Sequence, residues 1–252
     1  MIRAIHHVGI VVRRLSDAYG LYRDVLGLPL IKEAEVTDQG VRAALLAAGD
    51  SEVELLEPLD PNNGVGRFLA RHGEGLHHVC FDTPDVAGEL AGVKDKGAAV
   101  IDHAPRTGLA GTIAFLHPRA CAGVLVELAM PFAHGGVPPA AKLRLKRVVI
   151  GATDVRGATA IFQHLFGFNE IAMNGGPRVM LGVARCSLLV VPAEEVGGTE
   201  GMVALSMVSD DFDGLIASLE RARTPGVLRG TGEVTLDSRA THGVPLHISK
   251  YE

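Results

Sequence analysis

The chain has 252 residues, of which 47% are hydrophobic, 21% charged and only 4% aromatic. This composition is ordinary for a globular protein and excludes general disorder, and the length allows one large core or two smaller ones. No run of about 18 uncharged apolar residues occurs, which excludes a membrane-spanning helix. The formal net charge is −5, Lys and Arg are scattered, three cysteines are dispersed and the N-terminus lacks an apolar signal segment. We therefore expect a cytoplasmic protein with reduced thiols that binds neither nucleic acid nor membrane.

The first half of the chain contains two predicted units that each open with a strand and continue into a helix. In the first unit, residues 5–12 form the predicted strand, Ser16 is the expected N-cap of the helix, and Gly27 ends that helix. In the second unit, a strand over 76–81 precedes a helix that begins near Pro84.

A segment rich in Gly and Pro, 132–142, separates this half from a second half of similar size. Such a segment continues neither a helix nor a central strand, so we interpret it as a linker. The second half opens with a predicted strand over 145–152 and a helix that starts after Asp154. Its last unit has a strand over 202–208 and a helix from about Asp211.

The halves repeat each other at a fixed offset, because Leu26-Gly27-Leu28 and Phe166-Gly167-Phe168 lie 140 positions apart. Within each half the pattern repeats once more, which gives four units of roughly 50 to 65 residues. The expected fold is α+β, built of four units that each consist of a strand, a helix and further strands. We expect two domains in tandem, 1–131 and 143–252.

Four polar residues occupy matching places in the first two units. His7 and His78 lie on the opening strands, and Glu54 and Glu127 lie on late strands. The separation is 54 − 7 = 47 in one unit and 127 − 78 = 49 in the other. If the two units are related by a pseudo-twofold axis, these two imidazoles and two carboxylates meet at that axis.

A divalent metal ion accounts for this grouping. Val124, Val126 and Leu128 flank Glu127, which predicts a buried strand, and a buried lone carboxylate is costly. Two imidazoles and two carboxylates suit Zn, Co, Ni, Mn or Fe and leave two positions of an octahedral shell for a bidentate substrate. Taken singly, each residue is more ordinary: Glu52 and Glu57 flank Glu54, so this strand is also typical of a charged sheet edge.

Several segments of residues 4–130 resemble the vicinal oxygen chelate superfamily, which comprises glyoxalases, bleomycin-resistance proteins and dioxygenases. The resemblance implies that the four units are βαβββ modules, two in each domain. Within it, the first half is most similar to methylmalonyl-CoA epimerases. The segments that carry the resemblance are His6-His7-Val8-Gly9-Ile10, Gln39-Gly40-Val41, Val53-Glu54-Leu55-Leu56-Glu57-Pro58-Leu59, Gly73-Glu74-Gly75-Leu76-His77-His78-Val79, Phe115-Leu116-His117-Pro118 and Gly123-Val124-Leu125-Val126-Glu127-Leu128.

The resemblance implies an isomerase that epimerises a 2-substituted malonyl-CoA by removing and returning the α-proton through a metal-stabilised enolate. The metal positions of the family fall on His7, Glu54, His78 and Glu127. Glu127 is the first choice of catalytic base, and Glu54, a water molecule or a residue of the second half are the candidates for the second.

Three further residues are expected to contact the substrate, although each also has a simpler explanation. Gln39, in Gln39-Gly40, is equally typical of a turn, and His117 of a loop hydrogen bond before a proline. Arg106 is a candidate contact for the CoA phosphates, and an exposed surface charge is the alternative.

Two departures from the epimerase pattern stand out. Ala43 lies where some family members carry a catalytic glutamate, and the chain is about twice as long as a typical epimerase. In the second half, the ligand positions fall on Arg147, Ser187 or Leu188, Ala204 and His247. We therefore expect 143–252 to be a metal-free sister domain, and the protein to be a monomeric pseudo-dimer or a homodimer.

Three alternative functions stay open from the sequence alone. A glyoxalase I-like lyase uses a similar His/Glu/His/Glu set. An extradiol-type dioxygenase also has four modules in tandem but prefers two His and one carboxylate. A non-catalytic small-molecule binding protein needs aromatic surface, of which this chain has little, with no Trp and 3 Tyr.

Overall fold

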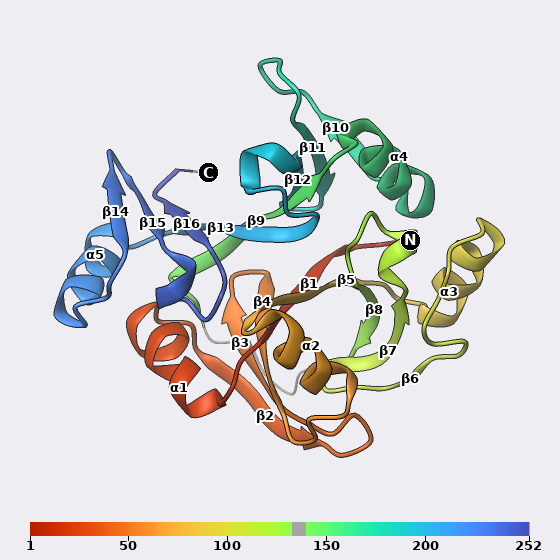
Figure 1. The fold of residues 1–252 in the computed structure, drawn as a ribbon, viewed down its shortest axis with the longest axis horizontal. Coiled ribbons are helices and arrows are strands. Elements are labelled where there is room, and N and C mark those ends of the chain that lie inside the picture. Colours follow the sequence, from red (N-terminus) through yellow and green to blue (C-terminus); the bar gives the residue numbers. More distant parts are fainter. Residues whose placement is uncertain (133–139, 252) are drawn as a thin grey trace. The chain divides into compact units, whose positions relative to one another are not determined.

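The computed structural model describes residues 1–132 and 140–251. It is an α+β structure in which the strands form two eight-stranded sheets, one from each half of the chain (Figure 1). The predicted linker at 132–142 falls for the most part on residues 133–139, which lie outside the described residues.

Each half contains the βαβββ pattern twice, as the repeats predict. The modules of the first half consist of β1 (Ala4–Val11), α1 (Leu15–Tyr19) with the π-helical turn η1 (Gly20–Val25), β2 (Leu30–Val36), β3 (Val41–Ala48) and β4 (Ser51–Pro58), then β5 (Gly75–Asp82), α3 (Val86–Asp95), β6 (Arg106–Thr107), β7 (Gly111–Leu116) and β8 (Val126–Pro131). A helix that the repeats do not predict, α2 (Gly64–His72), joins these two modules.

The second half follows the same order without a helix between its modules. Its elements are β9 (Leu143–Ala152), α4 (Val155–Phe166), β10 (Asn169–Ile171), β11 (Val179–Val183) and β12 (Cys186–Pro192), then β13 (Gly201–Ser209), α5 (Phe212–Arg221), β14 (Val227–Gly230), β15 (Glu233–Leu236) and β16 (Leu246–Ser249). Short 3₁₀ turns lie at η2 (Pro118–Ala120), η3 (Ala193–Val196) and η4 (Ser238–Ala240).

The opening strands of the modules lie in the middle of the sheets. The strand order is β2-β3-β4-β1-β5-β8-β7-β6 in the first sheet and β10-β11-β12-β9-β13-β16-β15-β14 in the second. Strands β5 and β8 pair in parallel, as do β9 with β12 and β13 with β16, while the outer strands pair antiparallel. Residues on the central strands are therefore flanked by strands on both sides, which favours their burial.

The described residues also group into two compact units, and each unit takes one module from each half. One unit comprises Met1–His7, 78–132 and Arg147–Val203, and the other comprises Val8–His77, 140–146 and 204–251. Strand β1 passes from the first unit to the second between His7 and Val8. The division of the chain into 1–131, 132–142 and 143–252 therefore stays a prediction.

Three of the helices begin with the same type of N-cap. Asp85, Asp154 and Asp211 are the N-caps of α3, α4 and α5, and each carboxylate accepts the backbone N–H of a glycine three residues later. At the end of α4, Gly167 has φ +73°, a left-handed conformation that glycine adopts without strain.

The first helix departs from this scheme, and the prediction of Ser16 as its N-cap is wrong. The N-cap of α1 is Arg14, whose side chain makes no capping hydrogen bond. Glu57 Oε2 accepts the N–H of Leu15 at 2.8 Å, so a carboxylate from β4 replaces a local cap.

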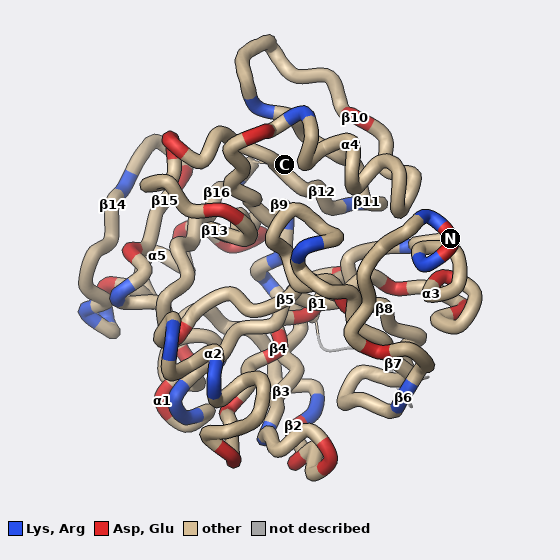
Figure 2. Tube along the Cα trace, turned by 45° about the vertical axis from the view of Figure 1, so that its right-hand side comes forward, with Lys and Arg blue, Asp and Glu red and all other residues tan. Residues whose placement is uncertain are grey.

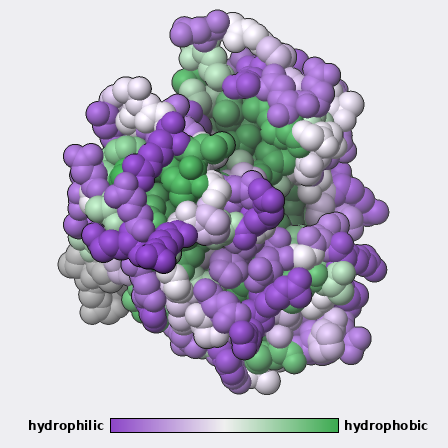
Figure 3. Space-filling view, turned by 60° about the vertical axis from the view of Figure 1, so that its left-hand side comes forward, coloured by the Kyte–Doolittle hydropathy of each residue, from purple (hydrophilic) through white to green (hydrophobic). Residues whose placement is uncertain are grey.

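The surface of the described chain is mixed in character. Figure 2 shows charges of both signs interspersed along the trace, and Figure 3 shows hydrophobic patches among hydrophilic side chains on one face. Exposed large hydrophobic residues such as Leu228 are ordinary in globular proteins. None of the described helices combines the length and apolar character that crossing a bilayer would require.

Tyr22 connects η1 to the loop before β16 within one compact unit. Its hydroxyl donates to the carbonyl oxygen of Thr241 at 2.9 Å, and the side chain is 1% exposed. Burial raises the pKa of Tyr22, so the hydroxyl keeps its proton and remains a donor.

We expect Tyr22→Phe to lower the free energy of unfolding by about 1–2 kcal/mol, because the buried Thr241 carbonyl loses its partner. Urea denaturation measures this. Tyr19→Phe is the matched control: its hydroxyl donates to Glu33 in an exposed setting, so its loss costs less than about 0.5 kcal/mol. Equal losses in both variants would contradict the assignment.

Candidate metal centre

Three of the four predicted ligands come from neighbouring strands of the first sheet. His7 lies on β1, His78 on β5 and Glu127 on β8, and their exposed fractions are 0%, 2% and 4%. In the parallel pair of β5 and β8, Glu127 is the register partner of Cys80. His78, two residues before Cys80, therefore presents its side chain on the same face as Glu127.

The three ligand atoms converge on one point. Nε2 of His7 lies 2.9 Å from Nε2 of His78, and Oε2 of Glu127 lies 3.0 Å from the first nitrogen and 3.2 Å from the second. Neighbouring ligands in an octahedral shell, each about 2.0–2.2 Å from the ion, stand about 3 Å apart. Two nitrogens and one oxygen at this spacing fit one divalent transition-metal ion.

Glu127 has an unusual electrostatic environment. Burial acts to raise the pKa of the carboxyl, but the side-chain hydrogen bonds and electrostatic interactions with His7 and His78 outweigh that effect and hold the pKa below its usual range. Glu127 is therefore a carboxylate at neutral pH, which is the form that a metal ligand needs.

The fourth predicted ligand, Glu54, lies on β4 and belongs to the other compact unit, so its place beside the other three ligands stays a prediction. β4 is not a sheet edge, since it lies between β3 and β1, and Glu54 is 6% exposed. The charged-edge interpretation of this strand is therefore wrong. Glu52, on the same face of β4, is 7% exposed, a second buried carboxylate that the sequence analysis did not single out.

Phe115 and Arg106 extend the site beyond the ligands. Phe115 is the register partner of Glu127, and its ring meets that of His78 edge-on at 5.5 Å between centroids. The Arg106 guanidinium lies 5.5 Å over the Phe115 ring, and its Nε donates to Asp102 at 3.1 Å. Nη1 of Arg106 is buried without a hydrogen-bond partner among the described residues.

The other two predicted substrate contacts have local structural roles. Gln39 lies in the turn between β2 and β3, where its backbone carbonyl accepts the Asn63 amide at 2.9 Å. His117 is exposed and caps η2, accepting the N–H of Arg119 at 3.2 Å. These roles match the simpler alternatives, and substrate contact by either residue stays a prediction.

The equivalent positions of the second sheet carry different chemistry. Arg147 on β9 pairs in register with Ser187 on β12, so Ser187 rather than Leu188 shares its face. His247 on β16 pairs in register with Ser206, two residues after Ala204, and contacts Glu233 at 3.2 Å. Both groups of described side chains with metal-ligand spacing come from the first sheet.

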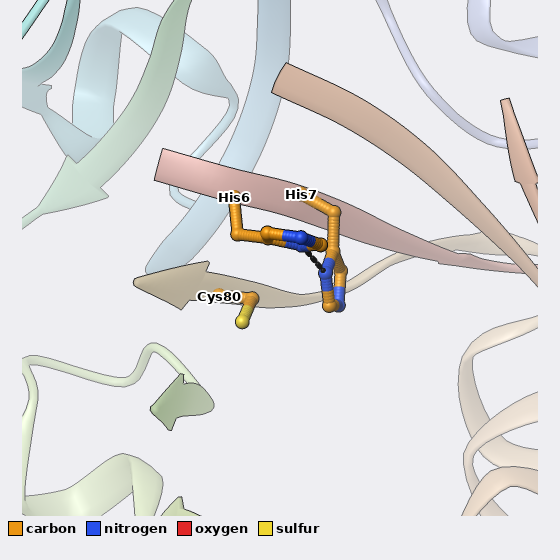
Figure 4. A group of neighbouring side chains, drawn as sticks. All are labelled: His6, His7 and Cys80. Atoms are coloured by element: carbon orange, nitrogen blue, oxygen red, sulfur yellow. Dashed lines mark hydrogen bonds between the residues drawn. The ribbon is translucent and has the colours of Figure 1, made fainter. Parts of the chain in front are cut away.

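Three neighbours of the ligands, His6, Cys80 and Phe115, are not among the site residues predicted from the sequence. His6, immediately before His7, lies with its Nδ1 2.8 Å from Nδ1 of His7 (Figure 4). Cys80 on β5 completes a second group with these two histidines, again within 4.8 Å. The pair of adjacent histidines was the available signal for His6, whereas the contact of Phe115 with His78 depends on strand register.

We expect the purified protein to contain about one divalent metal ion per chain. His7→Ala and Glu127→Gln should each lower the metal content below about one tenth of an ion per chain, because each removes a ligand at the convergence point. Elemental analysis with circular dichroism as a fold check measures this. His247→Ala, at the matching position of the second sheet, is the control and should retain the wild-type metal content. Unchanged content in both ligand variants would refute the site.

The fold and sequence resemble known proteins in two ways. Over the first half, the chain is 33% identical to the ethylmalonyl-CoA/methylmalonyl-CoA epimerase of Cereibacter sphaeroides across 131 residues, which are 51% of this chain and 98% of that protein. It is 38% identical to a solved methylmalonyl-CoA epimerase in complex with methylmalonyl-CoA and NH4⁺, with a TM-score of 0.51, covering 53% of this chain and 97% of that one.

Over nearly the whole chain, the fold matches a mutant of 4-hydroxymandelate synthase from Streptomyces coelicolor with a TM-score of 0.75, covering 98% of this chain and 92% of that one. The sequence identity is 16%, so this likeness shows the tandem fold alone. The sequence model of the glyoxalase/bleomycin resistance protein/dioxygenase superfamily matches residues 6–115. The chain belongs to this superfamily.

Proposed function

We propose that the protein is a metal-dependent epimerase of a 2-substituted malonyl-CoA such as methylmalonyl-CoA. The observation that carries the proposal is the convergence of His7, His78 and Glu127 within 3.2 Å of one another on the half that is similar to epimerases. His7, Glu54, His78 and Glu127 would hold one ion, for which Co, Ni, Mn, Zn and Fe are candidates.

The ion, when bound, supplies Lewis-acid stabilisation of negative charge on a carbonyl oxygen, an effect worth several kcal/mol. A malonyl thioester has two oxygens in a 1,3 relation, a carboxylate oxygen and the thioester carbonyl oxygen. Side chains that fix both oxygens also fix the direction of the α-proton between them, which lowers the entropic cost of proton transfer.

Glu127 is the proposed first proton acceptor. It is a carboxylate at neutral pH, which is the form that can take the α-proton, and its Oε2 lies at the convergence point where the ion would hold the substrate oxygens.

A second carboxylate must return the proton to the opposite face of the carbon, and Ala43 offers none. Glu54 is the proposed residue, because it is a buried carboxylate on the last strand of its module, as Glu127 is on the last strand of the next. Glu52 is the comparison residue, since it lies buried two residues earlier on the same strand face.

Arg106 is the proposed substrate-binding cation. Its guanidinium is held by Asp102 and lies over Phe115, which contacts the His78 ring. The buried Nη1 without a described partner provides a donor for an anionic oxygen of the substrate. Gln39 and His117 remain proposed as further substrate contacts.

The second half is proposed to be a sister domain without a metal that takes the place of the second subunit of a dimeric epimerase. The tandem fold supports this arrangement, because one chain provides both eight-stranded sheets.

In deuterium oxide, we expect the wild-type protein with metal to exchange the α-proton of methylmalonyl-CoA and to interconvert its epimers. Mass spectrometry and chiral analysis measure the two events. Glu127→Gln should abolish both, because it removes a metal ligand as well as a base, whereas Glu54→Gln that still binds the metal ion should lose epimerisation at least 100-fold yet retain exchange in one epimer, as removal of one of two bases requires. Glu52→Gln is the control with full activity.

Absence of exchange in any malonyl-type thioester by the metal-loaded protein would overturn the epimerase proposal. Formation of lactoylglutathione from the hemithioacetal would instead indicate a glyoxalase. Oxygen consumption on a catechol would indicate a dioxygenase, and tight binding without turnover would indicate a binding protein.

We expect Arg106→Gln to raise the KM for the acyl-CoA by about 10- to 100-fold with kcat within about threefold, because it removes a charged hydrogen bond made equally in ground and transition states. Steady-state kinetics measures the split. Lys94→Gln is the control, since Lys94 is an exposed cation of the same unit. A fall in kcat with unchanged KM would contradict a binding role.

A further inference from the structure

His6 and His7 are adjacent on β1, yet their rings meet. Nδ1 of His6 lies 2.8 Å from Nδ1 of His7, the ring centroids are 5.1 Å apart and the ring planes are 82° to each other. In Figure 4 the dashed line joins these two nitrogens, with the Cys80 sulfur on the neighbouring strand β5. His7 is fully buried, and His6 is half-buried.

His7 therefore uses both of its ring nitrogens. Nε2 points to the convergence point with His78 and Glu127, and Nδ1 points to His6. A nitrogen that binds a metal ion carries no proton, so a neutral His7 ligating through Nε2 must carry its proton on Nδ1. That N–H has His6 Nδ1 at hydrogen-bond distance, and His6 must then carry its own proton on Nε2.

We propose that His6 is a positioning residue for the metal ligand His7. Its Nδ1 accepts the Nδ1–H of His7, which selects the His7 tautomer with a free Nε2 lone pair and fixes the rotation of the ring. This inference rests on the proposed metal site. Groups that orient ligating histidines through the second ring nitrogen affect metal affinity about 10- to 100-fold.

The same hydrogen bond excludes a second ion in the group of His6, His7 and Cys80. A metal ion there would need the lone pair of His7 Nδ1, which the proposal assigns to a proton. With the hydrogen bond, the protein binds one ion and Cys80 stays a thiol. With a second ion in this group, the protein binds two ions and Cys80 is a thiolate ligand.

The first experiment measures Zn²⁺ affinity of the full chain by competition with a chelator. The side chains of Leu and Asn have the same branched shape. Only in Asn is the δ atom an acceptor oxygen, and this oxygen lies as many bonds from Cα as Nδ1 of His6 does. We expect His6→Leu to weaken Zn²⁺ binding about 10- to 100-fold and His6→Asn to stay within about threefold of the wild type.

His77→Ala is the positional control. His77 precedes the ligand His78 as His6 precedes His7, but its ring meets Phe68 edge-on at 5.0 Å. We expect its Zn²⁺ affinity to stay within about threefold of the wild type. Circular dichroism identifies any variant that fails to fold, and the Asn variant tests the proposal independently of the Leu variant.

The second experiment records ¹⁵N histidine spectra of the Zn²⁺-loaded protein. We expect His6 to carry its proton on Nε2 and His7 on Nδ1. A Nδ1–H tautomer of His6 in the loaded protein would overturn the proposal, as would equal Zn²⁺ affinities of His6→Leu and the wild type.

Titration with Co²⁺ distinguishes the remaining outcomes. One equivalent without a thiolate-to-cobalt absorption band supports the proposal, whereas two equivalents with that band would assign His6 and Cys80 to a second ion and overturn it. A wild-type protein that binds no divalent ion overturns the metal site itself. If the wild type and His6→Leu both bind a single ion with equal affinity, only the positioning role of His6 is overturned.

Discussion

The rest of the site depends on keeping one carboxylate, that of Glu127, ionised in the middle of a sheet. Removing such a group from water costs several kcal/mol unless partners compensate. The compensation comes from two imidazoles on neighbouring strands, 3.0 and 3.2 Å away. Strand order brings them together, because β1, β5 and β8 are consecutive in the first sheet. The βαβββ repeat therefore determines where the ligand atoms lie, and the chemistry proposed for the protein follows from this placement.

Much of this arrangement was predictable from the sequence, because it depends on periodicity and repetition. The 140-residue offset of Gly27 and Gly167 identified the duplicated modules. Both glycines have positive φ in the structure, Gly167 as the C-cap of α4 and Gly27 one residue after the C-cap of η1. His7 and Glu127 could be selected because similar spacings in two units are improbable by chance and because apolar neighbours predicted a buried strand. Side-chain alternation then indicated which residues share a face.

The remaining features depend on contacts between residues far apart in the sequence. The carboxylate at the start of α1 comes from Glu57, 42 residues away, so no local pattern around Ser16 could indicate it. The interior position of β4 follows from sheet order, which the charges around Glu54 obscured. The approach of Phe115 to His78 requires the register of β7 on β8. Each is a tertiary constraint on side chains whose local sequence is unremarkable.

The proposed role of the second half, a sister domain without a metal, has an evolutionary consequence. In a symmetric homodimer every mutation appears in both subunits, so a change at a ligand position removes both centres together. A fused duplication relaxes that constraint, because Arg147 stands where a histidine would be expected without altering His7. Selection can therefore preserve catalysis in one copy while the other drifts toward a new role, such as recognising a different ligand.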